Sequence, residues 1–316
     1  MATRVTTNAP ASTYDPTILR WEMLTKRRFD EIDRANAIVL VTCSPLEVHG
    51  PHVSERHRDR EILELPYIFA ASDPLPHPGS LFFHPQTTVK VLVDLGRSLA
   101  AQGFKNVFVS NFHGSPRHFL SIEKACDKVA REREINMACI FSILITRLTG
   151  GGSELYDALG DLPGVEKENL VGDAHGGLVE TSQLLALHPE WVERDYGALP
   201  RRTVDLWLDE QGQAKPAAER GKPPGLLAMV RSFQAGLAFF RADTYAGAPG
   251  AASPELGHQI LDTLSKHGGD TVSEILDGKL PPQQWHSPLW PKRFLFTNTL
   301  MVRLFNRLLR IPDGIA

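Results

Sequence analysis

Cysteine is scarce in this sequence. The 316 residues include only three, Cys43, Cys126 and Cys139, and no Cys-x-x-Cys pair. Three cysteines with this spacing exclude a disulfide framework and a cysteine-rich zinc site. We expect reduced thiols, which are typical of the cytoplasm. Because Cys43 has no paired His/Asn signature, we interpret it as a small packed residue rather than a nucleophile.

Long apolar runs and an excess of charge are also lacking. No window of 18 apolar residues exists, so we expect no membrane-spanning helix. Residues 1–20 lack the apolar region of a secretion signal and are interpreted as a flexible arm. The net charge is only −3, from 34 basic and 37 acidic residues, which argues against a nucleic-acid partner. Hydrophobic and charged fractions of 42% and 22% are typical of a soluble globular protein, here expected to be cytoplasmic.

Short apolar runs alternate with helical patterns. Residues 37–42, 106–110 and 138–145 are continuous apolar runs, which are typical of strands buried on both faces. Between them, the apolar spacing predicts helices over residues 88–102 and 116–129. Strands that alternate with helices indicate βαβ units, so the predicted fold class is α/β with a mostly parallel sheet.

A first polar cluster follows the first predicted strand and reads Glu47-Val-His49-Gly-Pro-His52, with His57 and Asp59 a little further on. Glu47 and His49 are two residues apart, so they share a face in an extended segment. Carboxylate and imidazole together are ligands that Zn, Mn or Fe accept, and open α/β sheets place their sites at strand carboxyl ends. The alternative is a polar surface loop.

A second cluster, Asn111-Phe-His113-Gly-Ser115, follows the second predicted strand. His113 is therefore expected at the same carboxyl edge of the sheet as the first cluster. The alternative is a histidine that only caps the next helix.

The third cluster runs from Gly172 to Ser182 and contains His175 and Glu180. Glu180 is predicted in the first turns of a helix, where the helix dipole favours a carboxylate. Asp173 either holds His175 in place or caps the helix. Taken alone, Glu180 is better explained as a surface residue of that helix. Three His/carboxylate clusters at element ends together favour one site, with the ligand inventory of a two-metal hydrolase.

In this order the clusters resemble the signature of the creatininase (creatinine amidohydrolase) family: E-x-H-G-P-H-L with an aspartate shortly after, N-G-H-G-G-N, and H-A-G-E-x-E-T-S. The likeness extends over roughly residues 20–275. It implies a three-layer α/β/α metallohydrolase domain at residues 21–280, assembled as a homo-oligomer, possibly a hexamer. It also implies one or two divalent metal ions (Zn, Mn or Fe) and cleavage of a C–N bond in a small cyclic or N-formyl amide.

The resemblance also assigns roles to residues. Glu47, His49 and His113 match metal-ligand positions, Glu180 matches the family's carboxylate at the site as a metal ligand and catalytic group, and His175 matches a catalytic histidine beside the substrate.

Two positions depart from the family pattern. The family's bridging aspartate falls at Arg58, so Asp59, one residue later, or His57 is its expected replacement. Ser115 stands where creatininase has a glutamate ligand. The alternative function is therefore a catalytically impaired relative that serves as a binding or assembly subunit.

Residues 281–316 lie beyond the resemblance and form a C-terminal extension. Its last part predicts an amphipathic helix with Leu300, Met301 and Leu304 on one face and arginines beside them. Such a helix packs on its own domain, covers a neighbouring subunit, or lies on a membrane surface.

Overall fold

The computed structural model describes residues 18–21, 24, 26–43, 60–70, 72, 83–149, 159–213 and 226–309. The strands are β1 (Ile18–Arg20), β2 (Ile38–Thr42), β3 (Ile62–Glu64), β4 (Asn106–Ser110) and β5 (Asn136–Cys139). The α-helices are α1 (Lys26–Glu31), α2 (Pro85–Ala101), α3 (Pro116–Arg133), α4 (Ile140–Thr149), α6 (Lys167–Leu170), α7 (Leu178–Leu187), α8 (Val204–Glu210), α9 (Leu226–Ala242), α10 (Pro254–Leu276), α11 (Arg293–Thr297) and α12 (Thr299–Leu309). Short 3-10 helices are Pro189–Trp191, Tyr196–Ala198, Pro249–Ala251, Pro282–Gln284 and Trp290–Lys292.

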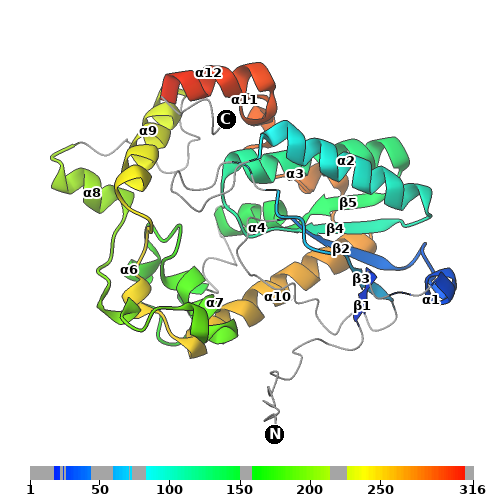
Figure 1. Ribbon diagram of the computed structural model, residues 1–316, viewed down its shortest axis with the longest axis horizontal. Helices are drawn as coiled ribbons and strands as arrows, with labels where there is room; N and C mark the ends of the chain where they lie inside the picture. Colours follow the sequence, from blue (N-terminus) through cyan, green and yellow to red (C-terminus); the bar gives the residue numbers. More distant parts are fainter. Residues whose placement is uncertain are drawn as a thin grey trace, which may run out of the picture.

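The strands form one sheet in the order β1-β3-β2-β4-β5, and all of its strand pairs are parallel. Helices α2 and α3 cover one face, where Leu92 and Ile122 pack against Val39 and Val107. Helices α4 and α10 cover the other face (Figure 1). The α/β class, the mostly parallel sheet and the three-layer arrangement predicted from the sequence are therefore confirmed.

The predicted helices at residues 88–102 and 116–129 are confirmed. The first begins earlier, at Pro85, and ends at Ala101, and the second continues to Arg133. The predicted strand at 138–145 is correct only for its first two residues, because β5 ends at Cys139 and α4 begins at Ile140. A continuous apolar run fits a buried helix as well as a buried strand. Here Ile143 of α4 is buried in the core beneath the sheet, which explains why this helix is so apolar.

Helix α10 joins the sheet to a helical region that contains α7. Its first half packs against α7, where Leu256 and Ile260 meet Leu178 and Leu185. Its second half lies beneath the sheet. The two helices approach closely at Gly257, where a Cβ atom would lie only 1.9 Å from the carbonyl oxygen of Ser182. Helix α7 and its preceding loop are thereby fixed relative to the sheet (Figure 1).

The C-terminal extension packs on the same molecule. Phe296 of α11 is buried against Phe119 and Leu120 of α3. In α12, Val302 is fully buried, whereas Leu300 and Leu304 are 73% and 56% exposed. Part of the predicted apolar face therefore points to solvent. Among the helices that the structure describes, none combines the length and the apolar character needed to cross a membrane.

Candidate active site

The carboxyl ends of β2 and β4 lie side by side. Thr42 is paired with Ser110 in register, and the amide of Cys43 donates to the carbonyl oxygen of Ser110 at 3.0 Å. His113 follows β4 by three residues. The first cluster begins four residues after Cys43, and its members Glu47, His49, His52, His57 and Asp59 lie outside the described residues. The last described residues before the first cluster therefore lie beside the end of β4, after which the second cluster starts.

Asn111 holds the turn that presents His113. Its side-chain amide donates to the carbonyl oxygen of His113 at 3.0 Å, and its Oδ1 atom accepts from the His113 amide at 2.9 Å. The Nε2 atom of His113 is shielded from solvent. The Asn-x-His spacing of the second cluster thus has a local structural purpose, because the asparagine closes the loop on both sides of the histidine.

Beneath His113 lies a second histidine, which the sequence analysis missed. His118 is fully buried in α3, and its ring lies edge-on to that of His113 with the centroids 5.4 Å apart. Its Nδ1 atom accepts from the Ser72 amide at 3.3 Å, and its Nε2 atom lies 3.1 Å from the carbonyl oxygen of Cys43. Since Nδ1 is an acceptor, Nε2 carries the proton and donates it to Cys43.

Burial, with a smaller contribution from His113, lowers the pKa of His118 to about 3, so the ring is neutral. His118 joins the end of β2, the segment around Ser72 and the start of α3. The only signal in the sequence was a histidine in the first turn of the helix that follows His113. Cys43 is also fully buried, and burial raises the pKa of its thiol to about 12. A protonated thiol agrees with its interpretation as a packed residue.

His175 and Glu180 meet at the start of α7. The Oε2 atom of Glu180 accepts from the amide of Gly176 at 2.6 Å and lies 3.6 Å from Nδ1 of His175. Both side chains are largely buried, with 24% and 19% exposed. The carboxylate lies at the positive end of the helix, as the sequence predicted.

Asp173 caps this helix. Its two carboxylate oxygens accept from the amides of Leu178 and Val179 at 2.6 and 3.0 Å. Burial raises the pKa of Asp173, although these hydrogen bonds act in the opposite direction. The cap requires glycine at position 177, because a Cβ atom there would lie 1.8 Å from Oδ1 of Asp173. Of the two roles considered for Asp173, the structure shows the helix cap.

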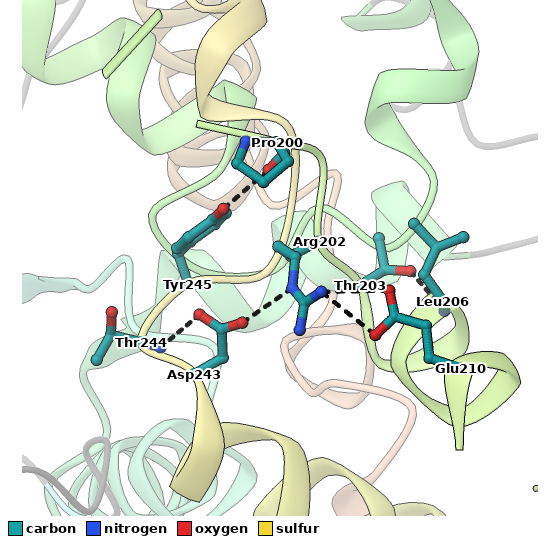
Figure 2. Close-up of polar contacts among 8 residues, drawn as sticks. All are labelled: Pro200, Arg202, Thr203, Leu206, Glu210, Asp243, Thr244 and Tyr245. Atoms are coloured by element: carbon teal, nitrogen blue, oxygen red, sulfur yellow. Dashed lines mark hydrogen bonds and ion pairs between the residues drawn. The ribbon is translucent and has the colours of Figure 1, made fainter. Parts of the chain in front are cut away.

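The loop that carries His175 is anchored by a short antiparallel arrangement of backbone. His175 and Ala246 exchange hydrogen bonds of 3.1 and 2.7 Å, and Arg202 and Gly247 exchange hydrogen bonds of 2.9 and 2.6 Å. Side chains reinforce the pairing of Arg202 with Gly247, as Figure 2 shows. The guanidinium of Arg202 binds Asp243 at 3.0 Å and Glu210 at 3.2 Å. The hydroxyl of Tyr245 donates to the carbonyl oxygen of Pro200 at 2.9 Å. The backbone of His175 is therefore held by a segment that is itself fixed to α8 and to the end of α9.

The structure thus brings His175 and Glu180 together at the start of α7, and places His113 separately, just after the end of β4. Within the described ranges, no group of three or more His, Cys, Asp or Glu side chains is arranged to hold a metal ion. Three of the five predicted metal ligands, Glu47, His49 and Asp59, belong to the part of the chain that is not described.

The described part of the chain thus has a parallel sheet between two layers of helices, with His113 just after the end of β4. The family model for creatininase, described as creatinine amidohydrolase, matches residues 55–270. The chain therefore belongs to the creatininase family. No curated protein sequence matches the chain.

Solved structures agree in fold. A structure described as "Creatininase Mn" has 17% sequence identity and a TM-score of 0.53, over 82% of this chain and 98% of its own. One described as creatinine amidohydrolase (creatininase) has 17% identity and a TM-score of 0.51 over the same shares. A creatininase mutant of Zn-Zn type has 17% identity and a TM-score of 0.50, over 82% of this chain and 98% of its own. At this identity the likeness establishes the fold alone.

Proposed function

We propose that this protein is a metal-dependent amidohydrolase that cleaves a C–N bond of a small cyclic or N-formyl amide with metal-activated water. The observation that carries the proposal is the pairing of Thr42 with Ser110, from which the first two clusters both continue. The family membership supports the same reaction class. We also propose that the protein acts as a homo-oligomer.

The donor chemistry of these clusters fits a divalent cation. Glu47, His49, Asp59, His113 and Glu180 would supply imidazole nitrogens and carboxylate oxygens, the mixture that Zn, Mn and Fe accept. Two of the similar solved structures are described with Mn and with Zn-Zn. A bound divalent metal would lower the pKa of its water from 15.7 to about 7, which provides hydroxide near neutral pH.

His175 and Glu180 supply the proton chemistry of the proposed reaction. With Nδ1 of His175 facing the Glu180 carboxylate, the other ring nitrogen is the one that delivers a proton to the leaving amide nitrogen. The carboxylate stabilises the charged imidazolium and fixes the ring orientation. General acid catalysis of this kind typically contributes about 10²- to 10⁴-fold. The backbone pairing of His175 with Ala246 holds the acid in position.

One observation favours the second candidate, a catalytically impaired binding or assembly subunit. Glu180 accepts a hydrogen bond from the amide of Gly176, a contact that also suits a purely structural capping residue. Ser115, which stands where creatininase has a glutamate ligand, also favours this second candidate.

Elemental analysis and activity together test the proposal. We expect transition metal in the native, unchelated protein, and hydrolysis in a screen of cyclic and N-formyl amides. His113→Ala and His49→Ala should lose metal and activity together, with an unchanged circular dichroism spectrum. His188→Ala is the matched control, because this histidine stacks on exposed Trp191 at the end of α7 opposite to Glu180. A native protein without metal would favour the second candidate, and full activity after metal stripping would exclude the mechanism.

A further inference from the structure

A cavity of about 270 Å³ lies along β5, at the edge of the sheet. Residues of helix α3 and of β5 form two of its walls, and Pro282, Trp285 and His286 form the third. These three residues belong to the C-terminal extension, beyond the region that the family model matches. Edge strands in native proteins are usually covered, and here the extension provides part of that cover. The cover leaves a space between itself and the strand.

One wall of the cavity carries a buried carboxylate. Glu123 of α3 is 1% exposed. Its Oε2 atom accepts from the Ser287 amide at 3.3 Å and lies 3.7 Å from Nδ1 of His286. Its Oε1 atom is buried and has no hydrogen-bond partner among the described residues, and the same holds for Nδ1 of His286. An unsatisfied buried carboxylate oxygen is costly, so this position favours a further donor, which none of the described residues provides.

Most of the other charges around the cavity are paired with one another rather than with Glu123. Asp127, one turn further along α3, is paired with Arg131 and lies 3.6 Å from Nε2 of His286. Within the described part of the chain, His286 is the one basic side chain within ion-pair distance of Glu123. The remaining walls are largely apolar, and they include Ala130, Ile135 and Trp285.

We propose that this cavity binds a small organic cation. Its ammonium or guanidinium group pairs with Glu123, whose fully buried side chain has to turn towards the cavity to reach it. Its apolar body packs against Ala130, Ile135 and the indole of Trp285. An aromatic wall adds to the attraction for a cation. A metal ion is not the ligand we propose, because no group of three metal-ligating side chains is arranged for one among the described residues. None of the residues that carry the proposed hydrolase reaction lines this cavity.

Calorimetric titration of the full chain tests the proposal. The probes are n-butylammonium, which joins a cation to a short apolar body, and n-butanol, its uncharged counterpart. We expect n-butylammonium to bind more tightly than n-butanol. Glu123→Gln keeps the shape of the side chain and removes its charge. In this variant the affinity for n-butylammonium should fall about tenfold, the equivalent of one charge-assisted hydrogen bond. The affinity for n-butanol should stay the same.

Two further variants make the result specific to this cavity. Ala130→Leu fills the cavity with apolar atoms and leaves Glu123 in place, so binding of both probes should be lost. Glu132→Gln changes a glutamate of the same helix that pairs with Arg97 at the surface, and both affinities should stay as in the wild type. Equal affinities for the two probes, or unchanged n-butylammonium binding in Ala130→Leu, would overturn the proposal. Because binding is measured without catalysis, the result is independent of the hydrolase reaction.

Discussion

The guanidinium of Arg202 donates to the carboxylate of Asp243 at 3.0 Å and ties the loop before α8 to the end of α9. The backbone of the same arginine pairs with Gly247, next to the residue that pairs with His175. A surface-proximal ion pair is thus linked to a proposed catalytic histidine through the neighbouring residues Ala246 and Gly247. Figure 2 shows the contacts of the Arg202 side chain. The pair acts on the site by holding the backbone that supports His175.

Arg202→Met should therefore loosen the loop before α7. The variant removes the contacts to Asp243 and Glu210, and we expect faster amide exchange over residues 172–177. Hydrogen–deuterium exchange with peptide resolution measures this directly. Arg97→Met, which removes an ion pair between α2 and α3, is the matched control and should leave exchange in this loop unchanged. Equal exchange in wild type and Arg202→Met would show that the backbone pairing alone holds the loop.

Asp173→Ala should destabilise the protein. It removes the acceptors for the amides of Leu178 and Val179 and leaves both without their cap. Loss of a helix cap costs about 0.5–2 kcal/mol. Asp173→Asn keeps one acceptor oxygen and should recover part of the loss. The free energies of unfolding in urea measure both effects, and equal values for the Ala and Asn variants would contradict a capping role.

The close approach of α7 and α10 predicts opposite effects for two glycines of the same helix. Gly257→Ala places a Cβ atom 1.9 Å from the Ser182 carbonyl oxygen, so the helices must separate. Overpacking of this kind costs about 1–3 kcal/mol. Gly268→Ala meets Ile140 at 3.8 Å, an ordinary contact, and should stabilise the helix by roughly 0.5–1 kcal/mol. Urea denaturation of both variants gives the comparison, and a stabilised Gly257→Ala variant would contradict the packing described.

Much of the fold could be predicted from local patterns. The apolar runs at 37–42 and 106–110 lie in the centre of the sheet and are buried on both faces, which is the situation in which such runs are most informative. The run at 138–145 contains the end of an edge strand and the start of a helix, and its composition does not change at the boundary. Strands β1 and β3 have three residues each, which is too short for any periodicity.

Residues of the candidate site likewise fall into those that the sequence could predict and those that it could not. His113, His175 and Glu180 could be singled out because each follows or begins an element and stands in a recognisable motif. The contribution of His118 depends on Ser72 and Cys43, which lie 46 and 75 residues away and share no pattern with it. The cavity beside Glu123 depends on Ser287 and His286, which are more than 160 residues distant. Contacts of this kind arise only from the tertiary fold.

Acid should weaken the link between α2 and α3 through Glu132. Hydrogen bonds from Lys128 and Arg97 lower the pKa of Glu132 to about 2 from its usual 4.5. Because the unfolded chain takes up this proton first, the stabilisation is fully present above pH 4.5 and is lost as the pH falls towards 2. Glu132→Gln lacks this pH dependence. The free energy of unfolding of the wild type should therefore exceed that of the variant by a larger amount at pH 7 than at pH 3. Urea midpoints of both proteins at the two pH values measure the difference. A carboxylate that stabilises the fold only in its charged form must contribute less at a pH where the unfolded chain holds the proton. If the difference between the two proteins is the same at both pH values, the ion pairs of Glu132 therefore do not contribute to stability.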